Sequence, residues 1–139
     1  MMEQLKRILN KGKHSLVVDN NGIHVFGGRG ISDLYRLLND SPEVLKGARV
    51  ADKVVGKAAA SLMILAGVRE LYAEVASKEA LVLLDRYKIP VSAPVAVKYI
   101  SNRMHTGLCP MELCVANCQT PEECLAAIER MIKTQSINK

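Results

Sequence analysis

Two segments of the sequence carry side chains whose types and spacing suit chemistry. In the first segment, Asp52, Lys53 and Lys57 stand at the expected start of an apolar helix. Residues four apart in a helix share a face, so both lysines are expected beside the free N–H groups of the helix start, where anions bind. Asp52 could orient a hydroxyl group or keep a lysine charged. In the alternative interpretation, Asp52 only caps the helix and the lysines form a solvated face.

The second segment, residues 103–112, contains Cys109 directly before Pro110. Proline is favoured at the first position of a helix, so Cys109 is expected at a helix start, where a thiolate is stabilised. Such a cysteine could act as a nucleophile, with Lys57 or His105 assisting. The alternatives for this cysteine are a contact with a bound ligand or a purely structural role.

Four further residues complete the predicted site. Ser77 is expected to cap a second helix. Arg103 could pair with an anion or simply with Glu112, and helix capping alone would explain Thr106. The predicted ligand-binding residues are Asp52, Lys53, Lys57, Ser77, Arg103, Thr106, Cys109 and Glu112. The candidates for a catalytic role among them are Asp52, Lys57 and Cys109.

The composition indicates one folded domain with a moderately basic surface. The chain has 139 residues, 49% of them hydrophobic and mostly aliphatic, with one phenylalanine and no tryptophan. That length fits a single domain with a substantial core. The net charge of +5 is scattered along the chain, and few rings are available for stacking on bases. These features disfavour a nucleic-acid partner and leave small anionic ligands open.

Two features bear on the location of the protein in the cell. No apolar run reaches the roughly 20 residues that a membrane span needs, and the N-terminus alternates charged and apolar residues, unlike a signal peptide. All cysteines follow residue 100, so they cannot cross-link the whole fold, which favours free thiols in a reducing cytoplasm. Their spacing matches no close metal-binding pair. These cysteines are Cys109, Cys114, Cys118 and Cys124.

The spacing of apolar residues predicts an α/β fold. The expected helices cover residues 2–9, 32–38, 53–66, 77–87, 109–117 and a last segment from 120, and the expected strands cover 15–19, 23–26, 48–51, 70–76, 89–91 and 95–100. Asn-Asn-Gly joins the first two strands and is typical of a tight antiparallel hairpin. From residue 54 to residue 91, helices and strands alternate, which is typical of a mostly parallel sheet with crossover helices.

The segments Val50–Ala60 (VADKVVGKAAA) and Asn102–Glu112 (NRMHTGLCPME) are similar to the signatures of a small uncharacterised prokaryotic family. That family is known only as a domain of unknown function with a cytidine-deaminase-like fold. The resemblance spans about residues 14–133, after an N-terminal helix within residues 1–13. It implies one domain over residues 1–139, a three-layer α/β/α sandwich with a mixed sheet and, because deaminase-like proteins often self-associate, a homo-oligomer.

The zinc site of deaminases is not matched by the residues of this chain. Zinc deaminases hold the metal between two helix starts through three His or Cys ligands, and a glutamate moves protons to and from the metal-bound water. The corresponding segments here are residues 51–57 and 76–80, and neither contains His or Cys. We therefore expect no zinc, no other cofactor and no deaminase activity.

Three functional hypotheses follow from the sequence. The first is a protein of the deaminase-like fold that binds a small anionic or nucleotide-like ligand in the cleft of the predicted site. The second is an enzyme of unassigned reaction that uses Cys109 as its nucleophile. The third is a scaffold or interaction module without small-molecule chemistry.

Overall fold

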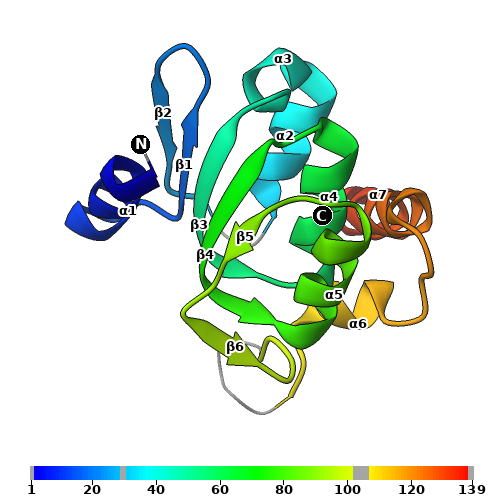
Figure 1. Cartoon of the computed structure of the whole chain (residues 1–139). Helices are drawn as coiled ribbons and strands as arrows, with labels where there is room; N and C mark the ends of the chain where they lie inside the picture. Colours follow the sequence, from blue (N-terminus) through cyan, green and yellow to red (C-terminus); the bar gives the residue numbers. More distant parts are fainter. Residues whose placement is uncertain (1, 29–30, 102–106, 138–139) are drawn as a thin grey trace.

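The computed structural model of the chain describes residues 2–28, 31–101 and 107–137. The described helices pack around one mixed sheet. Helices cover both faces of this sheet (Figure 1). The strands are β1 (Leu16–Asp19), β2 (Ile23–Phe26), β3 (Arg49–Val55), β4 (Glu70–Ser77), β5 (Val91–Ser92) and β6 (Val95–Val97). The helices are α1 (Met2–Lys11), α2 (Ser32–Asp40), α3 (Pro42–Leu45), α4 (Lys57–Ala66), α5 (Lys78–Arg86), α6 (Pro110–Val115) and α7 (Pro121–Ile137).

The sheet joins an antiparallel hairpin to a parallel unit, in the order β2-β1-β3-β4-β5, and β6 pairs with a later part of β4. Asn21 and Gly22 both have positive φ angles at the hairpin turn, which is why this turn favours asparagine and glycine. Strand β1 pairs antiparallel with β3, and β3, β4, β5 and β6 run parallel. The predicted mixed sheet with an N-terminal hairpin is therefore confirmed.

The crossover helices α4 and α5 lie on the same face of the sheet (Figure 1). Successive right-handed crossovers between parallel strands added in one direction must fall on one face. Helix α4 is apolar on nearly all sides because α2, α5, α6 and α7 surround it over the sheet. It ends at Gly67, whose φ of 78° is the left-handed conformation that glycine favours.

Among the helices that the structure describes, α1 alone covers the other face of the sheet (Figure 1). Its fully buried residues Leu5 and Leu9 pack on Val17, Ala51 and Tyr72 of the three central strands. Strand β3 is therefore covered on both faces. The sequence of a strand covered on both faces is a nearly continuous apolar run rather than an alternation of apolar and polar residues.

The predicted cap at Ser77 is confirmed, and Thr120 caps a second helix. Ser77 precedes α5, and its Oγ accepts a hydrogen bond from the N–H of Ala80. Thr120 precedes α7, and its Oγ1 accepts a hydrogen bond of 3.1 Å from the N–H of Glu123. The Glu123 carboxylate accepts from the Thr120 hydroxyl, so the pair forms a variant of a capping box.

The predicted helix over residues 53–66, with Asp52 as its cap, is wrong at its start. Strand β3 continues to Val55, Gly56 takes the cap position, and α4 begins at Lys57. Asp52 is instead a strand residue between Leu16 of β1 and Ala73 of β4. The strand expected over residues 95–100 is shorter, because β6 stops at Val97. The segment over residues 39–47, where no element was expected, contains the short helix α3.

Within the described residues, no helix combines the length and the apolar character that a bilayer span requires.

Candidate functional site

A cavity of about 290 Å³ lies where β3 ends and α4 begins. Its apolar walls are formed by Ile31, Val54, Ala59, Ile100 and Met111, and its polar lining is formed by Ser15, Asp52, Lys53, Cys109 and Glu112. The cavity thus combines a mostly apolar surface with a few polar groups, as small-molecule sites do. Four of the eight predicted site residues meet here although they come from two distant parts of the chain.

Asp52 is the most unusual polar residue of this cavity. It is only 9% exposed, and it shares the α4 side of the sheet with Val50 because side chains alternate along a strand. The pKa of Asp52 is raised to about 7, chiefly by burial and in smaller part by the nearby Asp33 carboxylate. Hydrogen bonds from the backbone N–H groups of Val54 and Lys53 oppose this rise. Near neutral pH this carboxyl group can therefore both donate and accept hydrogen bonds.

Glu112 closes the cavity at the start of α4. Its Oε1 accepts the N–H of Lys57 at 2.7 Å, and its Oε2 accepts the N–H of Ala58 at 3.0 Å. A side chain at Gly56 would occupy the place of this carboxylate. Burial raises the pKa of Glu112, the two N–H groups oppose that rise, and the Glu79 carboxylate adds to it. The first N–H groups of α4 are therefore satisfied by a residue of α6.

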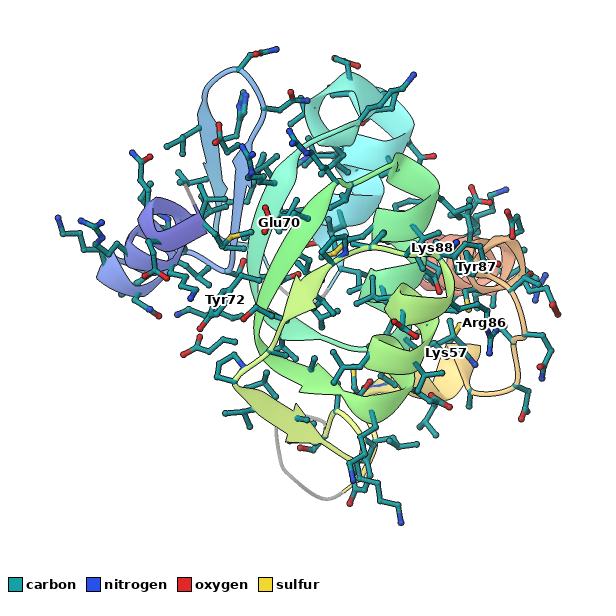
Figure 2. The ribbon with its side chains drawn as sticks, viewed as in Figure 1. Lys57, Glu70, Tyr72, Arg86, Tyr87 and Lys88 are labelled. Carbon is teal, nitrogen blue, oxygen red and sulfur yellow. The ribbon has the colours of Figure 1, made fainter. Side chains whose placement is uncertain are left out.

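Lys57 completes a reciprocal contact between the same two helices. Its Nζ donates to the carbonyl oxygen atoms of Cys118 at 2.6 Å and Ala116 at 3.3 Å, just beyond the end of α6. Figure 2 shows Lys57 beside α6, on the α5 side of the molecule. The expectation that Lys53 and Lys57 flank one anion site is therefore wrong, since Lys53 belongs to β3 and Lys57 extends toward α6.

The remaining predicted residues lie at helix starts or outside the described structure. Ser77 caps α5 and lines a neighbouring hollow together with Glu112. Cys109 is half-buried at the cap position of α6, as expected, and its N–H donates to the carbonyl oxygen of Ile100. Arg103, His105 and Thr106 lie outside the described residues. The start of α4, whose N–H groups were expected to be free for a ligand, is in use by Glu112, and the start of α5 is capped by Ser77 as expected.

Sequence reasoning missed several lining residues. Ser15 reaches the cavity because β1 pairs with β3 in a register that sets Leu16 opposite Asp52, and no local pattern predicts that register. Gly56 falls within the helix expected over residues 53–66, but it takes the cap position of α4. It packs closely against the Glu112 carboxylate. Among the residues that the structure describes, no three His, Cys, Asp or Glu side chains converge as a metal site would require.

Comparisons with known proteins identify the family. A family model described as a domain of unknown function, DUF1893 (TM1506), matches residues 4–132. The chain belongs to the DUF1893 family. The crystal structure of a DUF1893 family protein from Thermotoga maritima (TM1506) is similar, with a TM-score of 0.86 and 26% identity over 94% of this chain and 88% of that chain. No curated protein matches the chain. The predicted membership in a family of unknown function is thus confirmed.

The raised pKa of Asp52 predicts a pH-dependent stability. Between about pH 4 and about pH 7, the folded protein keeps a proton that the unfolded chain releases. The contribution of Asp52 to the free energy of unfolding is therefore fully present below about pH 4. It is lost as the pH rises toward 7, at roughly 1.4 kcal/mol per pH unit. Urea unfolding of wild type and Asp52→Asn across this range should show a shallower decline in the variant, in which Glu112, whose pKa is also raised, still contributes. Equal slopes for both proteins would contradict the assignment.

The Glu112 contact predicts a specific effect of a methyl group at residue 56. Gly56→Ala displaces a flexible carboxylate rather than backbone, so its expected cost is that of the two charge-assisted hydrogen bonds, about 1–3 kcal/mol of unfolding free energy. Gly107→Ala is the matched control because open space surrounds Gly107. In a Glu112→Ala background, Gly56→Ala should cost little. An equal cost in both backgrounds would show that the carboxylate is not the group displaced.

Proposed function

We propose that this DUF1893 protein binds a small nucleotide-like ligand in the Asp52 cavity, with the base inside, and that it does not deaminate it with zinc. The observation that carries the proposal is a buried carboxyl group, with a pKa raised to about 7, on the wall of an otherwise mostly apolar cavity. Among the described residues, only backbone N–H groups donate to Asp52. A buried polar group in that situation is a favourable partner for a ligand.

The chemistry of the cavity favours a flat heteroaromatic ring. Apolar side chains such as Ile31, Val54 and Met111 would contact its faces. A protonated Asp52 presents one O–H donor and one carbonyl acceptor side by side, which match a base edge that offers an acceptor next to a donor. The volume of about 290 Å³ lies near the lower end of ligand sites, which suits a base rather than a whole nucleotide.

The charge of the cavity argues against an anionic group inside it. Glu112 already occupies the α4 N–H groups that would bind a phosphate, and Lys57 is engaged at the end of α6. Lys53 is the one cationic side chain among the described lining residues. Any phosphate of the ligand would therefore lie outside, near the cavity opening. Arg103 and Thr106 stay predictions as contacts for that part.

The order of elements supports a cytidine-deaminase-like architecture as part of this proposal. A hairpin precedes parallel strands, and α4 and α5 lie on one face of the sheet. In that architecture the metal lies between the two helix starts. Glu112 takes a comparable place here, because it caps α4 and shares a hollow with Ser77 and Glu79 at the start of α5. The Glu112 carboxylate would thus occupy the place that the zinc-bound water has in a zinc deaminase.

A second candidate function uses Cys109, because its half-buried side chain lines the same cavity. An enzyme with this nucleophile would have Cys109 alkylated much faster than the other three cysteines at neutral pH. Peptide mapping after brief treatment with iodoacetamide measures the four rates. Equal rates, or fastest labelling elsewhere, would leave ligand binding or a scaffold role as the remaining hypotheses.

Ligand binding is tested with a panel of nucleobases, nucleosides and nucleotides in thermal unfolding and calorimetry. We expect at least one base or nucleoside to raise the melting temperature in a concentration-dependent way. Asp52→Ala should weaken that ligand at least about tenfold, and the affinity should fall as the pH rises above about 7. Lys78→Ala, which lies outside the cavity lining, is the control. No response to any base, or an equal response in Asp52→Ala, would overturn the proposal.

A further inference from the structure

Three of the four cysteines gather on the side of α4 that faces α6 and α7. Cys124 is fully buried on α7, and Cys114 and Cys118 pack against the same core from α6 and from the α6–α7 connection. The thiol of Cys124 is a neighbour of the Cys118 thiol and of Ser61 on α4, and it interacts electrostatically with Cys118. The Cys114 thiol instead donates to the carbonyl oxygen of Ala127 at 3.3 Å. Cys118 and Cys124 therefore form one pair of neighbouring thiols, a half-buried one and a fully buried one.

Solvent reaches this pair at Cys118, which is half-buried, whereas Cys124 is fully buried. Cys118 lines a polar cleft of about 430 Å³ between α5 and the α6–α7 connection. Lys78 and Arg86 lie eight residues apart on α5, and both line the cleft with Lys57. Figure 2 shows Lys57 and Arg86 on this side of the molecule. Among the described lining residues Glu79 is the one acidic group, so the cleft carries a net positive charge next to Cys118.

We propose that Cys118 and Cys124 form a reversible disulfide, and that the cationic cleft admits an anionic low-molecular-weight disulfide as the oxidant. Glutathione disulfide, which carries free carboxylates, is a suitable probe of that class. The proposal does not depend on the ligand of the Asp52 cavity, because the cleft and the cavity share none of their described lining residues.

The exchange proceeds in two balanced steps. The thiolate of Cys118 attacks one sulfur of the small disulfide, forming a mixed disulfide and releasing one small thiolate. The thiolate of Cys124 then attacks the Cys118 sulfur, forming the internal disulfide and releasing the second small thiolate. Two protein thiols are oxidised, one small disulfide is reduced to two thiols, and the two thiol protons pass to the released thiolates.

The burial of the two cysteines fixes their order. Cys124 is fully buried, and this burial raises the pKa of its thiol, so Cys124 is a poor first nucleophile. Cys118 lines the cleft and meets the oxidant first. Cys124, the buried neighbour of Cys118, is then positioned to resolve the mixed disulfide. The closed disulfide would also fix the connection whose Cys118 carbonyl oxygen binds Lys57.

The test is oxidation of the reduced, folded protein by graded glutathione disulfide, followed by intact mass and non-reducing peptide mapping. We expect loss of two hydrogens per chain without a lasting glutathione adduct, and one cross-linked peptide pair joining Cys118 to Cys124. Cys124→Ser should instead accumulate a stable glutathione adduct on Cys118. Cys109→Ser and Cys114→Ser are matched controls that should keep the internal disulfide. Adducts alone in the wild type, or a cross-link that uses Cys114 or Cys109, would overturn the proposal.

The role of the cleft is tested by changing the charge of the oxidant. Lys78→Gln combined with Arg86→Gln should slow the reaction with glutathione disulfide several-fold, because both cations line the approach to Cys118. The same variant should react with the neutral bis(2-hydroxyethyl) disulfide at the wild-type rate. Equal slowing with both oxidants, or no slowing with either, would overturn the role of the cleft in admitting the oxidant.

Discussion

The carboxylate of Glu112 is the contact on which the rest of this structure depends. Helix α4 is the central buried helix, and its start has glycine at the cap position, so no local side chain accepts its first N–H groups. Unsatisfied N–H groups at a buried helix start are costly. Glu112 accepts two of them from 55 and 54 residues away in the sequence. This contact requires glycine at residue 56 and fixes α6 against α4.

The same contact sets the character of the cavity. A helix start that would otherwise attract an anion is already neutralised, and Lys57 returns the contact by binding carbonyl groups at the end of α6. What remains open is an apolar space with carboxyl groups on its wall. A cavity of that kind accepts a ligand through hydrogen bonds to a neutral or partly neutral carboxyl group. The ligand group expected inside the cavity is therefore the edge of a base rather than a phosphate.

Local signals were sufficient for much of the fold. Ser77 and Thr120 are caps that can be read from the sequence, because each bonds an N–H group three residues later. The turn at Asn21 and Gly22 and the family signatures are also local. Asp52 was misread because an aspartate before apolar residues at helical spacing resembles a cap. Strand β3 is buried on both faces, so its apolar run is ambiguous between a strand and a helix.

The part of the site that could not be predicted depends on contacts between distant segments. The sequence predicted Glu112 as a ligand contact, but its role as the cap of α4 requires the position of α6 against α4. The place of Ser15 in the cavity wall depends on the register between β1 and β3. Lys57 was expected to face a ligand because the sequence shows its charge but not its hydrogen-bond acceptors. Those acceptors are the backbone carbonyl groups of Ala116 and Cys118.

The most direct test of this account follows the amide protons of Lys57 and Ala58 by nitrogen–proton NMR during a pH titration. Ionisation of Glu112 should move both signals downfield together, with one shared midpoint above the usual range for glutamate, because burial raises the pKa of this carboxyl group. Glu112→Gln should remove the shared step from both signals. A titration without that step, or a step that persists in Glu112→Gln, would contradict the central role of this contact.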